Sequence, residues 1–204
     1  MRLTTALAAT LLASAGVAHA ETRPLSGFTK VEAQAGTDVE VTVGGGFSVE
    51  VTGRDAQRIV TRVAGDTLIV EPVRGWSWRG PRNANVRVTM PRVEGLSASS
   101  GADLTATGVN GGAIELQSSS GADLRVSGSC ASFTADASSG SDIDAENLRC
   151  ENGSVDVSSG ADVRVYASGR LDVDASSGGG VRAYGNPGLG DIDLSSGGSF
   201  RRAN

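Results

Sequence analysis

Aspartates recur at a fixed place in a short phrase, and a column of carboxylates is the first chemistry that this sequence could support. Asp103, Asp123, Asp142 and Asp162 each follow a Ser-Ser-Gly phrase by two residues, at spacings of 20, 19 and 20 residues. Carboxylate oxygens of this kind are ligands for Ca²⁺. Calcium is therefore one interpretation of the column, and neutralisation by arginine side chains or turn amides is the other.

A series of arginines accompanies these aspartates and favours neutralisation. The arginines lie two residues beyond the aspartate position, with Asp144 interrupting the series: Arg125, Arg164, Arg182 and Arg201. A second set of aspartates lies four residues before the glycine of the later phrases: Asp136, Asp156, Asp174 and Asp193. Like charges stacked about 4.8 Å apart repel one another and need a counter-charge. We expect no cofactor other than the alternative of calcium at the first column.

Both tryptophans of the chain lie in one arginine-rich segment, which is a candidate ligand-binding surface. The segment contains Arg74, Trp76, Trp78, Arg79 and Arg82, between two runs that read as strands. Tryptophan and arginine are frequent anchors of interfaces, and paired aromatic rings can stack on the sugars of a glycan or another envelope component. The alternative, which we favour, is a hairpin loop folded back on the solenoid, with arginines packed on the indole rings.

The first 20 residues have the pattern of a secretory signal peptide. Arg2 precedes an uncharged apolar run, and small residues surround a cleavage point near Ala20. No later segment approaches the roughly 20 apolar residues that a transmembrane helix needs. We therefore expect an exported protein without a transmembrane anchor, located in the periplasm or outside the cell.

Cleavage would remove His19, the only histidine of the chain. Its loss excludes Ser-His-Asp and Cys-His catalysis, histidine general bases and histidine metal ligands. The net charge is −5 at pH 7, and removal of Arg2 makes the mature chain one charge more acidic. An acidic chain is a poor nucleic-acid binder, so we expect neither a nucleic-acid partner nor an enzyme.

Strands of a solenoid must position these residues. The glycines of the Ser-Ser-Gly phrases recur every 18 to 20 residues from Gly101 to Gly197, and such a period is typical of one repeat per coil. Apolar residues alternate with polar ones within each repeat, as in strands. The sequence predicts an all-β, single-stranded, right-handed β-helix with coils of about 19 residues. One inward column is expected to contain Leu104, Leu124, Ile143, Val163, Val181 and Phe200.

The corners and the boundaries of the solenoid are also expected from the pattern. The second serine of each phrase, such as Ser120, should point inward at a sharp corner, where the glycine supplies an unusual backbone angle. We expect a single domain over residues 21–204, with N-terminal strands in 27–94 and regular coils in 95–204. Asp55 to Val63 read as one short helix.

Cys130 and Cys150 lie at equivalent positions on neighbouring coils. Each precedes the glycine of the next Ser-Ser-Gly phrase by ten residues. Strands about 4.8 Å apart are within the Cα separation of a disulfide, and an exported chain meets an oxidising compartment. The register therefore predicts a Cys130–Cys150 disulfide that joins adjacent coils.

Several segments resemble a known family. They are LSGFTKVEAQAGTDVEVTVGGGFSVEVTG at residues 25–53, GDTLIVEP at 65–72 and NVRVTMPRVEGLSASSGADL at 85–104, followed by the Ser-Ser-Gly coils. Together they are similar to the head GIN domain family, described as "putative auto-transporter adhesins". The resemblance covers about Leu25 to Phe200. It implies a β-helical domain exported by bacteria, mostly without an assigned activity, and it transfers no catalytic residue.

These observations favour a non-catalytic envelope or surface module that presents loops on a rigid solenoid, with an adhesive or ligand-binding role. Two alternatives remain open. A β-helical polysaccharide-active enzyme could use the aspartate and arginine columns, and a calcium-dependent structural protein could use the aspartates alone.

Overall fold

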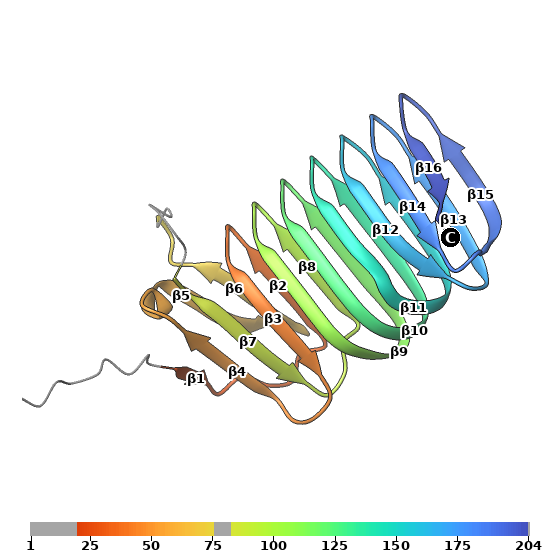
Figure 1. The fold of residues 1–204 in the computed structure, drawn as a ribbon. Coiled ribbons are helices and arrows are strands. Elements are labelled where there is room, and N and C mark those ends of the chain that lie inside the picture. The colour runs from red at the N-terminus through yellow and green to blue at the C-terminus, as the bar shows by residue number, and fades with distance from the viewer. Residues whose placement is uncertain (1–19, 76–82, 204) are drawn as a thin grey trace, which may run out of the picture.

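The chain folds into a two-faced β-solenoid (Figure 1), and the computed structural model describes residues 20–75 and 83–203. The fold confirms the predicted all-β, single-stranded architecture. All strands of the described residues belong to one hydrogen-bonded sheet. They are β1 (Glu21–Arg23), β2 (Lys30–Gln34), β3 (Asp38–Val43), β4 (Ser48–Thr52), β5 (Ile59–Ala64), β6 (Thr67–Pro72), β7 (Asn85–Met90), β8 (Gly95–Ser99), β9 (Asp103–Ser119), β10 (Asp123–Ser138), β11 (Asp142–Val157), β12 (Asp162–Ala167), β13 (Arg170–Ala175), β14 (Gly180–Tyr184), β15 (Gly188–Leu194) and β16 (Ser199–Arg202).

Each coil places one strand segment on each of two faces. β9, β10 and β11 run around a bend from one face to the other, whereas the later coils break at the bend into β12 and β13, and then into β14 and β15. The first face continues through β3, the first halves of β9 to β11, β12, β14 and β16. The second face continues through β2, β8, the second halves of β9 to β11, β13 and β15. Neighbouring coils pair in parallel.

The inward column predicted from the repeat is confirmed. Leu104 pairs with Leu124 across β9 and β10, and the same register continues to the last coil. Five members of the column are at most 3% exposed, and Phe200 on β16 is partly buried against the same core. Because side chains alternate across a strand, the aspartates beside these residues point to solvent in a parallel column.

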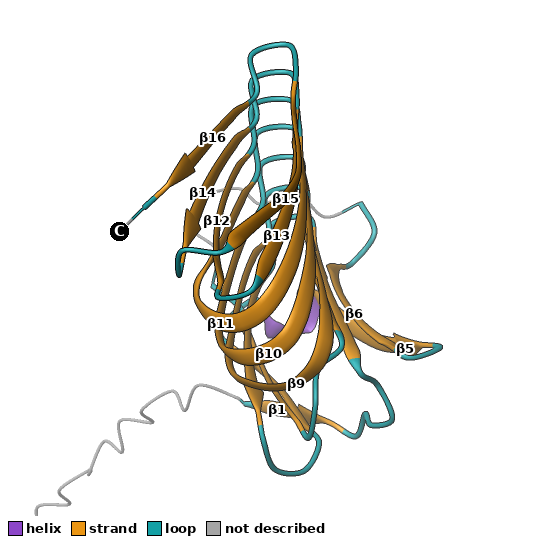
Figure 2. Ribbon diagram, turned by 90° about the vertical axis from the view of Figure 1, so that its right-hand side faces the viewer, coloured by secondary structure: helices purple, strands orange, loops and turns teal. Residues whose placement is uncertain are grey.

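The corners lie along one edge of the solenoid, where Figure 2 shows them as a ladder of short loops. The predicted inward position of the second serine is wrong: Ser120 and its equivalents are exposed. Ser120 and Gly121 both have positive φ, at 55° and 68°. Two successive residues with positive φ, together with a bond such as that from the Ala161 amide to the Ser158 carbonyl at 3.1 Å, are the pattern of a type I′ turn. The first serine and the residue after the glycine therefore frame the corner.

Antiparallel strands occupy the N-terminal end of the sheet. β4 pairs with β7 and β1, and β5 pairs with β6. The helix expected over Asp55 to Val63 is wrong beyond its first turn, because only Ala56–Arg58 form a 3₁₀ helix (η1) and β5 begins at Ile59. The β-branched residues Val60, Thr61 and Val63 favour a strand there.

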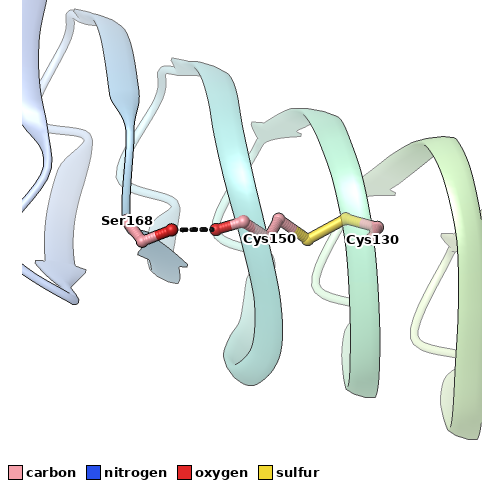
Figure 3. Close-up of a disulfide and its surroundings, with 3 residues drawn as sticks. All are labelled: Cys130, Cys150 and Ser168. Atoms are coloured by element: carbon pink, nitrogen blue, oxygen red, sulfur yellow. Dashed lines mark hydrogen bonds between the residues drawn. A yellow bond between two sulfur atoms is a disulfide. The ribbon is translucent and has the colours of Figure 1, made fainter.

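The predicted disulfide joins β10 and β11 at the bend between the two faces (Figure 3). Cys130 and Cys150 are direct partners in the strand register, with their Cα atoms 4.5 Å apart. The Ser168 hydroxyl on the following coil donates a hydrogen bond to the Cys150 carbonyl at 3.5 Å. Three successive coils are therefore connected at this bend.

No helix within the described ranges is long and apolar enough to cross a membrane.

Candidate functional site

An open groove lies on the second face of the solenoid. Its volume is about 730 Å³, and it crosses the strands from β2 to β13. Six neighbouring strands at about 4.8 Å spacing give it a length of about 24 Å. The groove therefore runs along the solenoid axis and has the shape of an extended ligand.

A close contact between two inward-facing positions lies beneath the middle of the groove. Phe133 and Gly153 are register partners on β10 and β11. A Cβ atom at Gly153 would overlap the Phe133 ring, so the phenyl group fills the space that a side chain of β11 would need. Ile114 lines the same part of the groove from β9. Phe133 and Ile114 are each only 3% exposed, so their side chains face the core and the floor exposes little apolar surface to a ligand.

Neutral polar groups surround this floor. Ser132 and Thr134 project from β10, and Asn152 and Ser154 project from the equivalent positions of β11. The Asn152 side-chain oxygen accepts a hydrogen bond from the Arg170 amide at 2.9 Å. Hydroxyls and amides of this kind can form hydrogen bonds with the hydroxyl groups of a sugar chain.

The charges at both ends of the groove are paired within the protein. At one end, the Lys30 Nζ atom lies 3.6 Å from Glu115 Oε2 and 4.0 Å from Asp66 Oδ2. At the other end, an Arg170 guanidinium nitrogen lies 2.6 Å from an Asp172 carboxylate oxygen. The hydrogen bond from Arg170 lowers the pKa of Asp172 and raises the pKa of Arg170. Paired ends leave the groove without a strong preference for a charged ligand.

The first aspartate column forms as predicted. Asp103, Asp123, Asp142 and Asp162 are consecutive register partners on the first face. Burial raises the pKa of Asp123, Arg125 opposes the change, and the neighbouring aspartates add to it. The Arg125 guanidinium lies 3.7 Å from the Asp123 carboxylate. Within residues 20–75 and 83–203, no group of three or more possible ligand side chains is arranged to hold a metal ion.

The second aspartate column lies on the second face beside a smaller hollow of about 330 Å³. Burial raises the pKa of Asp136, and the negative charges of Asp156 and Glu115 raise it further. A carboxyl whose pKa is higher in the folded than in the unfolded state stabilises the fold below the unfolded pKa, and this contribution is lost as the pH rises through the folded pKa.

We therefore expect Asp136→Asn to raise the melting temperature slightly at pH 7. The gain should shrink as the pH falls toward the ordinary aspartate pKa of about 3.9, because the wild-type carboxyl is then protonated as well. Thermal unfolding of both proteins between pH 3.5 and 8 measures this difference. A gain that is independent of pH would contradict a charge-based origin.

The tryptophan segment is only partly described. Arg74 is exposed after β6, whereas Trp76, Trp78, Arg79 and Arg82 lie outside the described residues. β6 and β7 pair with β2 and β3, and these two strands flank an ordinary corner.

Sequence reasoning did not identify the residues that line the groove. Ser132 and Asn152 share one position, eight residues before the glycine of the next phrase. Small polar residues at an outward position are also typical of an ordinary solvent face, so the pattern alone carried no signal for a groove.

Comparisons with known proteins match this architecture. Residues 27–187 match the family described as "Putative auto-transporter adhesin, head GIN domain". A solved "putative adhesin" from Bacteroides fragilis is 15% identical, with a TM-score of 0.72 over 93% of this chain and 98% of its own. Two proteins from Parabacteroides distasonis align over the same shares: a "putative adhesin" with TM-score 0.55 and 14% identity, and a "Putative lipid binding protein" with TM-score 0.52 and 16% identity. No curated protein matches the chain.

Proposed function

Because the chain belongs to the head GIN domain family, we propose that it is a non-catalytic, exported surface module that binds an extended neutral glycan in the groove of its second face. The observation that carries this proposal is the groove itself, which crosses six strands along the solenoid axis. Its neutral hydroxyl and amide groups can donate and accept hydrogen bonds with the hydroxyl groups of a sugar chain. The adhesins among the structural relatives support a binding role at a cell surface.

Three observations support export. The first described strand begins at Glu21, the first residue after the predicted cleavage point near Ala20. The Cys130–Cys150 disulfide is typical of proteins that fold in an oxidising compartment. The family is described in terms of adhesion, which takes place outside the cytoplasm. The site of action in this proposal is the periplasm or the cell exterior.

The tryptophan segment is a secondary contact in this proposal. Arg74, Trp76, Trp78, Arg79 and Arg82 supply the aromatic and guanidinium groups that bind sugars or envelope components. A Trp76→Ala, Trp78→Ala variant tests that role separately from the groove.

A polysaccharide-active enzyme is the alternative that one observation favours. Asp136 and Asp156 are neighbouring carboxylates beside the smaller hollow, and the pKa of Asp136 is raised. Two close carboxylates with different pKa values are the usual catalytic pair of glycoside hydrolases. Reducing ends released from a bound glycan, and their loss in Asp136→Asn, would establish that alternative. If calcium instead stabilises the fold, addition of a chelator should lower the melting temperature.

Bulky substitutions in the groove test the proposed function. Thr134→Trp with Ser154→Trp should fill the groove and weaken the binding of a neutral glycan at least tenfold. The control is Thr107→Trp, an exposed position on the first face. An array of neutral glycans identifies the ligand, and titration calorimetry compares the variants. Equal affinity in the groove variant and the control would show that the ligand binds elsewhere.

A further inference from the structure

Three arginines stack on the first face at the C-terminal end of the solenoid. Arg164 on β12, Arg182 on β14 and Arg201 on β16 are consecutive register partners, and all three are exposed. Their strands lie about 4.8 Å apart, so the guanidinium groups form a row along the solenoid axis.

These arginines lack the carboxylate partners that other arginines of the protein have. Arg62, Arg87 and Arg92 each lie within 3.3 Å of a glutamate oxygen. Across the described part of the chain, no carboxylate lies within ion-pair distance of the three stacked arginines. Like charges on adjacent strands destabilise a sheet. Asp144 is the register neighbour of Arg164 on β11 and Asp162 lies beside it on β12, whereas Arg182 and Arg201 have no carboxylate neighbour in the register of the described strands. The row therefore presents guanidinium groups to solvent that an external anion can bind.

The aspartate column ends where this row begins. Asp162 is its last member, and Gly180 and Ser199 occupy the next two positions. A Cβ atom at Gly180 would come within 2.5 Å of the Asp162 carboxylate, so that carboxylate uses the space that a side chain at position 180 would need, and a hollow lies beside it. This hollow has a volume of about 310 Å³ and is lined by all three arginines, by Ser199 and by the Asp162 carboxylate at one side. It is large enough for an anionic group and part of its sugar ring.

Both tyrosines of the chain adjoin the row. Tyr166 and Tyr184 are register partners on β12 and β14, two residues after Arg164 and Arg182. The Arg149 guanidinium lies 4.2 Å from the centre of the Tyr166 ring. A Cβ atom at Gly185 would come within 2.7 Å of the same ring, so the ring is held close to the neighbouring coil. Partly buried aromatic rings beside guanidinium groups combine the two interactions that recognise charged sugars.

We propose that this arginine–tyrosine face, formed by Arg149, Arg164, Tyr166, Arg182, Tyr184 and Arg201, binds a linear anionic polysaccharide. Guanidinium groups bind carboxylate and sulfate oxygens through paired N–H donors, which a lysine could not do in the same geometry. The polysaccharide lies along the solenoid axis, with its anionic groups on successive arginines. The site is on the opposite face from the neutral groove and does not depend on it.

Matched polysaccharides test this proposal with the mature protein, residues 21–204. Polygalacturonate is compared with its methyl ester, and dextran sulfate with dextran, in titration calorimetry. We expect both anionic polymers to bind and both neutral polymers to bind at least tenfold more weakly. A rise in NaCl from 50 to 500 mM should weaken the anionic complexes, because salt screens the exposed arginines. If neither polygalacturonate nor dextran sulfate binds, the proposal is overturned.

Two triple variants of equal charge separate the site from the general charge of the protein. Arg164→Gln with Arg182→Gln and Arg201→Gln should weaken anionic binding at least tenfold. The variant Arg62→Gln with Arg87→Gln and Arg92→Gln removes the same charge from paired arginines. Its affinity for the anionic polymers should stay within twofold of the wild-type value. Equal losses in the two variants would overturn the proposal. Equally tight binding of single-stranded DNA would also overturn it, because the site would then recognise any polyanion.

Two further measurements keep this test independent of folding and of the groove. Melting temperatures confirm that each variant is folded, and Arg182→Gln alone should not lower the value, since it relieves repulsion in the row. The groove variant Thr134→Trp with Ser154→Trp should retain anionic binding. A loss of anionic binding in that variant would place the anionic ligand in the groove and overturn the proposal.

Discussion

Gly128→Ala should destabilise the protein by about 4 kcal/mol, a large part of the 5–15 kcal/mol that stabilises a typical domain. Gly128 lies in β10 at a register shift against β9 and has a φ of 138°. Side chains rarely adopt this backbone angle, which alone costs about 1–3 kcal/mol. A Cβ atom would also overlap the Val109 carbonyl oxygen and lie 2.6 Å from the Val109 amide nitrogen. Because both atoms belong to the backbone of the preceding coil, the coils would have to separate.

Two other glycines provide matched controls for this substitution. Gly121 has a φ of 68°, but a Cβ atom there would meet nothing within 4 Å. Gly121→Ala should therefore cost only the left-handed backbone strain, about 1–2 kcal/mol. Gly111 also has open space around it and no positive φ. Gly111→Ala should be neutral or stabilise the fold by up to about 1 kcal/mol.

Thermal unfolding of the three variants measures these contributions. At roughly 2–4 °C for each kcal/mol, Gly128→Ala should lower the melting temperature by about 8–16 °C. A loss no larger than that of Gly121→Ala would show that the coils yield easily at this contact. The rank order of the three glycines tests coil-to-coil packing separately from backbone strain.

The coil-to-coil register was predictable because each coil packs equivalent residues at equivalent positions of the core. Leu124 must stack on Leu104 if each coil places the same residue over the same residue, so aligning the phrases also aligned the core. The N-terminal strands had no such internal reference. Ile59 to Val63 were therefore interpreted from local pattern alone, and the pairing of β5 with β6 overrode the expected helix.

The error at the corners has a physical cause. Strict alternation places Ser120 on the same side as Ser118 and Ala122. A turn with two residues of positive φ interrupts the alternation, so Ser118 and Ala122 are buried while Ser120 is exposed. Serine is an uncommon residue at such an angle, and the phrase therefore gave no indication that two residues rather than one adopt it.

The candidate sites differ in how far the sequence could define them. The arginine row follows directly from the register, because Arg164 and Arg182 keep one position in successive coils. The absence of ion-pair partners for these arginines could not be predicted from the sequence, since it depends on which carboxylates lie nearby in the folded protein. The groove could not be predicted, because the residues that line it occupy ordinary outward positions of several coils and no motif marks them.

Reduction of the Cys130–Cys150 disulfide should have the second largest effect on stability. The bond closes a segment with a sequence separation of 20 residues, for which loss of the cross-link costs about 3 kcal/mol. We therefore expect reductant to lower the melting temperature of the wild-type protein by about 6–12 °C. The Cys130→Ala, Cys150→Ala variant should melt at a similarly low temperature and should not respond to reductant. Thiol titration of the denatured, unreduced protein should detect no free thiol.

The disulfide should also affect the groove, because it joins the two coils immediately before the groove residues. Ser132 and Asn152 each follow a cysteine by two residues, on β10 and β11. Loss of the cross-link frees the bend between the faces, so these residues lose part of their fixed spacing and neutral glycan affinity falls with stability. Of the arginine–tyrosine face, Arg149 adjoins Cys150, but the stacked Arg164, Arg182 and Arg201 lie on the other face, where β12, β14 and β16 pair without the disulfide. Anionic binding should therefore survive reduction at temperatures where the protein stays folded. An unchanged melting temperature after complete reduction would contradict the stabilising role of the bond.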